Sequence, residues 1–140
     1  MGATLTIEAW VLPEAIAGKQ AILSNADESF VLGIVDGHVE FSTKTGTCVA
    51  EPCSDWNEYV SNRAFLPEGK WSHVAVTYDQ TNLAAATAFF YVDGVIVDKE
   101  VVQAASLINL DALLVGPLSG LVHDLRVSDK VFPPWYLKGA

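Results

Sequence analysis

Residues 71–79 read Trp-Ser-His-Val-Ala-Val-Thr-Tyr-Asp, a stretch in which β-branched and aromatic side chains would line both faces of an extended chain. Such a strand suits the middle of a β-sandwich. A second apolar run, 88–92, stops at Asp93-Gly94 and resumes over 95–97. The Asp-Gly pair is the strongest short-range signal for a β-hairpin, because both residues tolerate positive φ angles. We therefore expect a central strand and, close to it, a tight hairpin.

The N-terminal half predicts further antiparallel strands. Residues 4–11, Thr-Leu-Thr-Ile-Glu-Ala-Trp-Val, alternate with a period of two, so one side is apolar and the other carries threonine, glutamate and tryptophan. Residues 20–24 and 29–35 are two more apolar runs, and a second Asp-Gly pair leads into 38–43. These turns indicate an antiparallel meander, and no stretch shows helical periodicity. The residues assigned to the core are Leu5, Ile7, Ala9, Val11, Val74, Val76 and Val92.

Four motifs carry a resemblance to a known family. They are 5–11 (Leu-Thr-Ile-Glu-Ala-Trp-Val), 66–75 (Leu-Pro-Glu-Gly-Lys-Trp-Ser-His-Val-Ala), 91–94 (Tyr-Val-Asp-Gly) and 120–127 (Gly-Leu-Val-His-Asp-Leu-Arg-Val). Together they resemble the concanavalin A-like lectin/glucanase superfamily, in its laminin G-like branch. The resemblance implies an all-β fold, an antiparallel two-sheet β-sandwich of the jelly-roll type, and a fold-maintaining role for His73. It implies no single function, because this branch holds sugar binders, protein binders and architectural modules.

Length and charge limit the alternatives. A chain of 140 residues suits one domain, and we expect that domain to span residues 1–140. Asp and Glu number 17 against 8 Lys and Arg, so the net charge of −9 disfavours nucleic acid and anionic membranes and favours cations, neutral glycans or a basic protein patch. No stretch reads as a signal peptide, and the apolar tract 107–115 is too short and too polar for membrane insertion.

Residues 44–63 are long, polar and aromatic at once, and we expect them to form a loop. A loop that carries Trp and Tyr beside Asp and Asn is more typical of a binding loop than of a simple turn. We predict a sugar-binding site in which the flat rings of Trp56 and Tyr59 stack on a sugar while Asp55, Asn57 and Asn62 supply hydrogen bonds. The alternative is that Trp56 folds back over the core as a lid.

The two cysteines, Cys48 and Cys53, lie in the same segment with four residues between them. A disulfide between them would close a loop so short that chain entropy gives it only about 2 kcal/mol, so it would shape the loop more than stabilise the domain. It would also imply an oxidising compartment, and hence an extracellular or cell-surface location. Free thiols are the alternative. A zinc site is disfavoured, because no His or second Cys pair follows at ligand spacing.

Calcium is a further expectation, and it comes from the resemblance. Many members of the resembling group hold one calcium ion at the rim of the sandwich through Asp and Asn side chains and backbone carbonyls. Calcium takes about 6–8 oxygen ligands, which here would have to converge from separate loops. The predicted ligands are Asn25, Asp27 and Asp55, with Asn57 and Asn62 as further oxygen donors. The alternative is that these residues only form turns.

Catalysis is disfavoured by the pattern of carboxylates. Glucan hydrolases with the same jelly roll use acidic residues at alternating positions of one strand, which point the same way and act as nucleophile and acid. Here Asp55 and Glu58 are three apart and would face opposite sides of a strand. The histidines have no Ser or Cys nucleophile at a turn beside them, so a catalytic triad has no support either. We therefore expect a protein that is not an enzyme.

The sequence thus favours a carbohydrate-binding, lectin-like module whose partner is a glycan or glycoprotein. The competing interpretation is a protein-interaction or assembly module of a larger secreted protein, in which the same aromatic residues would anchor an interface. The resembling family usually has one more strand before residue 20. Closure of the sandwich by another segment, a tandem neighbour or a partner chain is therefore left open.

Overall fold

The computed structural model describes residues 4–25, 30–44, 56–81, 86–102 and 113–130, and at five strand-end positions (Asn25, Lys44, Trp56, Asn57 and Val102) it describes the backbone only. This part of the chain is folded into strands without any helix, so it holds no helix with the length and apolar character needed to cross a membrane. The strands are β1 (Thr4–Pro13), β2 (Lys19–Asn25), β3 (Phe30–Val35), β4 (His38–Lys44), β5 (Trp56–Phe65), β6 (Ser72–Asp79), β7 (Ala86–Val92), β8 (Val95–Val102), β9 (Leu113–Val115) and β10 (Gly120–Ser128).

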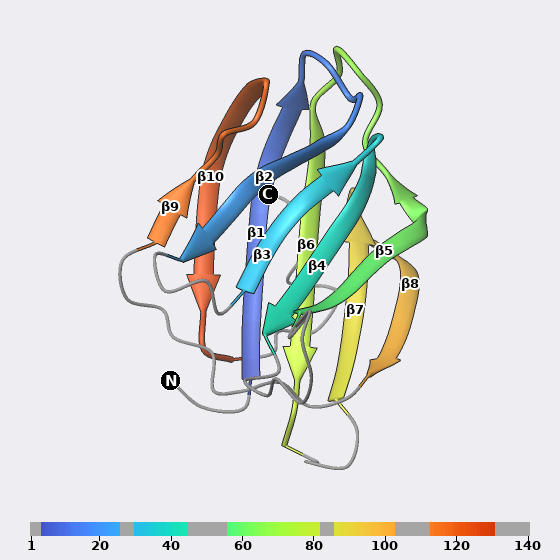
Figure 1. Ribbon diagram of the computed structural model, residues 1–140, viewed down its shortest axis with the longest axis vertical. Coiled ribbons are helices and arrows are strands. Elements are labelled where there is room, and N and C mark those ends of the chain that lie inside the picture. Colours follow the sequence, from blue (N-terminus) through green and yellow to red (C-terminus); the bar gives the residue numbers. More distant parts are fainter. Residues whose placement is uncertain (1–3, 26–29, 45–55, 82–85, 103–112, 131–140) are drawn as a thin grey trace, which may run out of the picture.

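The strands form two antiparallel sheets packed face to face (Figure 1). Sheet A has the order β10-β1-β6-β7-β8, and sheet B has the order β5-β4-β3-β2-β9. In Figure 1, β2, β3 and β4 lie in front of the long strands of sheet A, while β9 and β10 lie along one side of the sandwich and β5 and β8 along the other. The predicted all-β, antiparallel two-sheet sandwich is confirmed.

The strand predicted within residues 71–79 lies at the centre of sheet A. Strand β6 pairs with β1 on one side and β7 on the other, and seven of its eight residues are buried. Both Asp-Gly pairs form the predicted hairpins, β3–β4 and β7–β8. Asp36 and Asp93 have φ angles of 49° and 51°, and the glycines that follow them have φ angles of 85° and 79°. Positive φ at both turn positions is what a tight hairpin turn requires.

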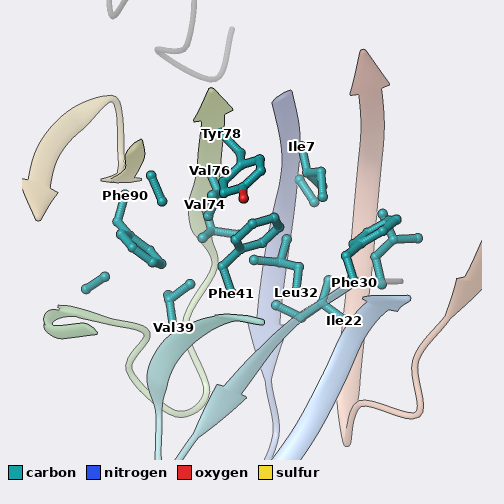
Figure 2. Close-up of a cluster of buried hydrophobic side chains, with 14 of the residues drawn as sticks. Ile7, Ile22, Phe30, Leu32, Val39, Phe41, Val74, Val76, Tyr78 and Phe90 are labelled. Carbon is teal, nitrogen blue, oxygen red and sulfur yellow. The ribbon is translucent and has the colours of Figure 1, made fainter. Parts of the chain in front are cut away.

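The core lies between the sheets, as Figure 2 shows. Side chains of β1 and β6 meet side chains of β3 and β4, and the rings of Phe41 and Tyr78 lie with centroids 5.3 Å apart across the interface. Every residue assigned to the core from sequence is either fully buried there or, for Val92, packed against the buried cluster. The larger fully buried side chains are Leu5, Ile7, Ile22, Leu23, Phe30, Leu32, Ile34, Phe41, Leu66, Tyr78 and Phe90.

One expectation about local structure is wrong. Residues 56–63 were expected to continue a loop, but they belong to β5, the strand at the edge of sheet B beside β4. The register of this pair shifts between His38 and Glu40, which marks a β-bulge. An edge strand has one neighbour and one face in solvent, so it accommodates the polar residues that made this segment read as a loop.

Candidate functional site

The five residues predicted to bind sugar lie on β5 or directly before it. Asp55 falls outside the described residues, and Trp56 and Asn57 are described in their backbone only. Tyr59 and Asn62 are described in full, and they do not face the same environment. The prediction for Asp55, Trp56 and Asn57 therefore stays a prediction.

Tyr59 packs its ring against the buried core between the sheets. Burial, followed by the charges of Tyr78 and Glu100, raises the pKa of Tyr59 to about 12. Asn62, by contrast, is exposed on the bulged part of β5. The structure thus separates these two residues, one toward the core and one toward solvent, and a ring that contacts the core offers little face for stacking on a sugar.

The predicted metal ligands and the predicted disulfide fall largely outside the described part of the chain. This holds for Asp27, Asp55, Cys48 and Cys53, while Asn25, at the end of β2, is described in its backbone only. Among the residues that the structure describes, no group of three or more His, Cys, Asp or Glu side chains is placed to hold a metal ion. Calcium and the disulfide both stay predictions.

A different constellation lies on the outer face of sheet A, the face turned away from sheet B. Glu8 of β1 and His73 of β6 are both buried there, with side chains 6% and 2% exposed. Their Oε1 and Nε2 atoms lie 3.4 Å apart. His73 Nδ1 is also buried and has no hydrogen-bond partner in the structure. A buried carboxylate and a buried imidazole are unusual on the outside of a sandwich, because burial of polar groups costs free energy unless they are paired.

Aromatic rings flank this pair. The ring of Trp10 meets the edge of the His73 ring at a centroid distance of 5.2 Å, and Trp71 and His123 meet in the same manner at 6.4 Å. The register explains the grouping, since Trp10 of β1 lies opposite His73 of β6 on one side and His123 of β10 on the other. Trp71 is 41% exposed. We call these four residues, Trp10, Trp71, His73 and His123, the aromatic face.

A fixed ion pair borders the aromatic face on β10. Arg126 donates from Nε to Oδ1 of Asp124 at 3.2 Å and from Nη2 to Oδ2 at 3.0 Å. Asp124 has a φ angle of 54° and lies where the β1–β10 register shifts between Glu8 and Trp10. A β-bulge of this kind redirects a side chain away from regular alternation. Asp124 follows His123 directly in β10, and Arg126 lies opposite Glu8 in the register of the two strands.

The electrostatics of the aromatic face keep His73 neutral. Burial lowers the pKa of His73 below its ordinary 6.5; the charges of Glu8 and Asp93 oppose this, and Arg126 adds to it. A neutral ring with one N–H directed at Glu8 leaves the other nitrogen as an acceptor. The arrangement therefore offers flat apolar rings, hydrogen-bond acceptors and one guanidinium on a single surface, which is the set of groups that polyhydroxyl ligands need.

The outer face of sheet B is built differently. Lys19 of β2 places Nζ 3.2 Å from Oε2 of Glu40 in β4 and 3.1 Å from Oε1 of Glu58 in β5. The Glu40 side chain is 1% exposed, whereas Lys19 and Glu58 are more than half exposed. Burial alone would lower the pKa of Lys19, but the hydrogen bond to Glu58 and the charge of Glu40 raise it overall. Here one lysine contacts two carboxylates and links β2, β4 and β5.

Glu8, Asp124 and Arg126 were not among the site residues predicted from the sequence. Alternation did place Glu8 and Trp10 on the outward side of β1, and that assignment is correct. What it lacked was the pairing of β1 with β10, which joins residues more than 100 positions apart. Two patterns in the sequence could have indicated this site. Glu8 and Trp10 share one face of a strand, and His73 follows Trp71 by two residues, so it shares a strand face with Trp71.

Solved structures share this fold at low sequence identity. The receptor-binding domain of botulinum neurotoxin type G is 13% identical with a TM-score of 0.63, and the match covers 97% of this chain and 37% of that one. The binding domain of botulinum neurotoxin DC in complex with rat synaptotagmin II is 14% identical with a TM-score of 0.66, covering 97% and 34%. A structure of botulinum neurotoxin type C, whose cell entry depends on interaction with two ganglioside molecules, is 16% identical with a TM-score of 0.66, covering 99% and 35%.

These identities establish likeness of fold alone, and the chain spans about a third of the length of each toxin fragment. No curated protein sequence matches the chain. The sequence model of one family does match, over residues 2–134. Its coverage of nearly the whole chain agrees with the two-sheet fold and with the four motifs quoted above. The chain therefore belongs to the concanavalin A-like lectin/glucanases superfamily.

Proposed function

We propose that this domain is a non-catalytic carbohydrate-binding module and that the aromatic face of sheet A contacts the sugar. The observation that carries the proposal is the exposed Trp71 ring beside His123, with the Asp124–Arg126 ion pair on the same strand as His123. Flat aromatic rings stack on the apolar faces of sugar rings, and fixed charged pairs hydrogen-bond the hydroxyl groups. Both requirements meet on one accessible surface.

The aromatic face is a better candidate than the segment around β5. Tyr59, one of the two predicted stacking residues, packs against the core, while Trp71 is 41% exposed. Trp56 keeps the role predicted from sequence, as a second sugar contact on the other sheet. The ganglioside interaction of the type C neurotoxin supports the proposal at the level of fold, because gangliosides carry sugars.

Calcium assistance, the Cys48–Cys53 disulfide and an extracellular location belong to the same proposal. Asn25, Asp27 and Asp55 are the proposed calcium ligands. A chelator should abolish binding if calcium bridges protein and sugar, and binding that survives chelation removes calcium from the mechanism. Mass spectrometry of unreduced protein tests the disulfide, since free thiols after oxidising preparation would remove it and the argument for location with it.

A glycan array, run with and without chelator beside light scattering, tests the proposed function. We expect specific glycan binding by a monodisperse protein. Trp71→Ala should then weaken binding to the best glycan by about fivefold or more, because one stacking contact contributes on the order of 1 kcal/mol. Its unfolding temperature should change little, because the ring is largely exposed. Trp56→Ala is the matched variant on the other sheet, and equal losses would place sugar contacts on both.

The alternative function, a protein-interaction or assembly module, is favoured by a separate observation. All three residues of the edge strand β9, Leu113, Leu114 and Val115, are exposed, at 37%, 52% and 62%. An apolar edge strand is a template for pairing with another chain. A blank glycan array together with a stable oligomer in light scattering would select this function over sugar binding.

A further inference from the structure

We propose that the ligand of the aromatic face is a neutral sugar, held through two adjacent hydroxyl groups by the carboxylate of Asp124 and stacked on Trp71. This inference rests on the proposed function, and it adds the chemical class of the ligand and the residue that binds it. It assigns to Asp124 a role in recognition. Arg126 is a positioning residue, which fixes the plane of the carboxylate.

The backbone at Asp124 is the first observation. Three non-glycine residues in the described chain have positive φ, and two of them, Asp36 and Asp93, precede glycine in the hairpin turns. Asp124 is the third, and it lies inside β10 at the bulge where the β1–β10 register shifts. A bulge residue with left-handed backbone is usually glycine, because a Cβ makes that conformation unfavourable. An aspartate at this position is therefore a reason to look for a function of its side chain.

The hydrogen-bonding capacity of Asp124 is the second observation. Each oxygen accepts one N–H from Arg126, at 3.2 Å and 3.0 Å. An ionised carboxylate has about four acceptor positions, so each oxygen retains one. The side chain is 38% exposed, so ligands can reach these positions. Two neighbouring sugar hydroxyls can each donate to one oxygen of a carboxylate whose orientation the arginine has already fixed.

The charges around the face decide between neutral and acidic sugars. The charged groups that bear on His73 are the carboxylates of Glu8 and Asp93 and the guanidinium of Arg126, and Asp124 adds a further carboxylate. Negative charge therefore exceeds positive charge at the face, as it does in the whole chain, with its net charge of −9. A carboxylated or sulfated sugar would be repelled on approach, while a neutral sugar would not.

Apolar side chains next to the ion pair suit a sugar as well. The His73 ring is buried against Trp10, so it supports the face from below. Leu121 of β10 is 53% exposed and lies opposite Leu12 of β1, next to the Val11–Ser72 pair that adjoins Trp71. An exposed apolar side chain near Trp71 suits a sugar ring, which has apolar C–H faces and hydroxyl edges.

The test combines an array with two substitutions at one position. The array carries neutral oligosaccharides built from glucose, galactose, xylose and mannose beside sialylated, uronate-containing and sulfated glycans. Isothermal titration then compares the parent with Asp124→Gly and Asp124→Asn on the best neutral oligosaccharide. Asp129→Asn is the matched control, because it removes the same charge just beyond the C-terminal end of β10.

We expect neutral glycans on the array and at least a tenfold loss of affinity for Asp124→Gly and Asp124→Asn, with no loss for Asp129→Asn. Asp124→Gly should unfold at or above the temperature of the parent, because glycine relaxes the positive φ. Loss of binding without loss of stability separates recognition from a structural role. Binding restricted to acidic glycans, or neutral binding that both Asp124 variants retain, overturns this inference while the proposed function stands. An array on which no glycan binds overturns both.

Discussion

The outer faces of the two sheets each bury one glutamate, and they give it different kinds of partner. On sheet B, Glu40 lies under the ammonium of Lys19, a flexible and half-exposed cation that also contacts Glu58. On sheet A, Glu8 faces His73, a neutral ring that is itself buried and held against Trp10. A lysine that spans three strands ties an edge strand to its sheet. The buried imidazole of His73, by contrast, supports a surface that carries exposed aromatic rings.

Both outer faces carry carboxylates, and the difference between their surroundings separates a structural face from a candidate binding face. Both clusters keep buried polar atoms without a hydrogen-bond partner in the structure, Oε1 and Oε2 of Glu40 on sheet B and Nδ1 of His73 on sheet A. The two faces differ in exposure, because sheet A also carries the exposed Asp124–Arg126 ion pair and the exposed Trp71 ring. A ligand can reach exposed groups, whereas a buried charge depends on its partner inside the protein. The comparison thus predicts stability effects on sheet B and binding effects on sheet A.

The largest effect on stability is expected from Lys19→Met on sheet B. The change leaves the Glu40 carboxylate 1% exposed and without its cation. Removing one partner of a buried pair costs several kcal/mol, and because Lys19 itself is half exposed we expect about 2–3 kcal/mol of unfolding free energy. Urea denaturation at pH 7 measures it. The double variant Lys19→Met/Glu40→Gln should recover part of the loss, because the uncompensated charge is gone. A loss below about 0.5 kcal/mol for Lys19→Met would show that water reaches Glu40.

The sequence predicted this architecture well where the signals are local. Alternation over residues 4–11 and the two Asp-Gly turns involve neighbours in the chain, so they gave the correct faces of β1 and the correct hairpins. Strand β5 was missed because its residues face solvent on one side and one edge, so they lack the apolar pattern of a paired strand.

The site could not be predicted in the same way. The aromatic face depends on which strand lies beside β1, and that strand, β10, comes from the other end of the chain. It depends also on the bulge at Asp124, which interrupts the alternation of side chains along β10. A bulge without glycine has no recognisable pattern in the local sequence. A binding loop is recognisable by composition, but a binding surface made from three separate strands is recognisable only after the strands have been ordered.

The second effect concerns pH and sheet A. The pKa of His73 lies below 6.5 in the folded protein because the ring is buried, so the unfolded chain takes up a proton more readily. Its contribution to stability is therefore fully present above pH 6.5 and is lost as the pH falls below that value, with a slope of at most about 1.4 kcal/mol per pH unit. Unfolding free energies from pH 7.5 to 5 should fall more steeply for the parent than for His73→Gln.

The comparison is made between the parent and His73→Gln under the same buffers and salt. The other acidic and basic groups are shared by parent and variant, so the difference between the profiles isolates His73. Identical slopes for parent and His73→Gln would mean that His73 is no harder to protonate in the folded state than in the unfolded chain. The contrast between a neutral partner on sheet A and a charged one on sheet B would then fail.

The smallest expected effect on stability distinguishes the two glutamates that contact Lys19 on sheet B. Glu58 and Glu40 contact the same ammonium at nearly the same distance, 3.1 Å and 3.2 Å, yet Glu58 is 57% exposed and Glu40 is buried. Exposed ion pairs contribute little, because water solvates both charges, so Glu58→Gln should cost less than about 0.5 kcal/mol in urea denaturation. Salt screens exposed charges far more than buried ones, so this small cost should vanish in about 1 M sodium chloride. The cost of Lys19→Met should largely persist there. If Glu58→Gln destabilises as much as Lys19→Met, the lysine acts through the edge strand and not through the buried carboxylate.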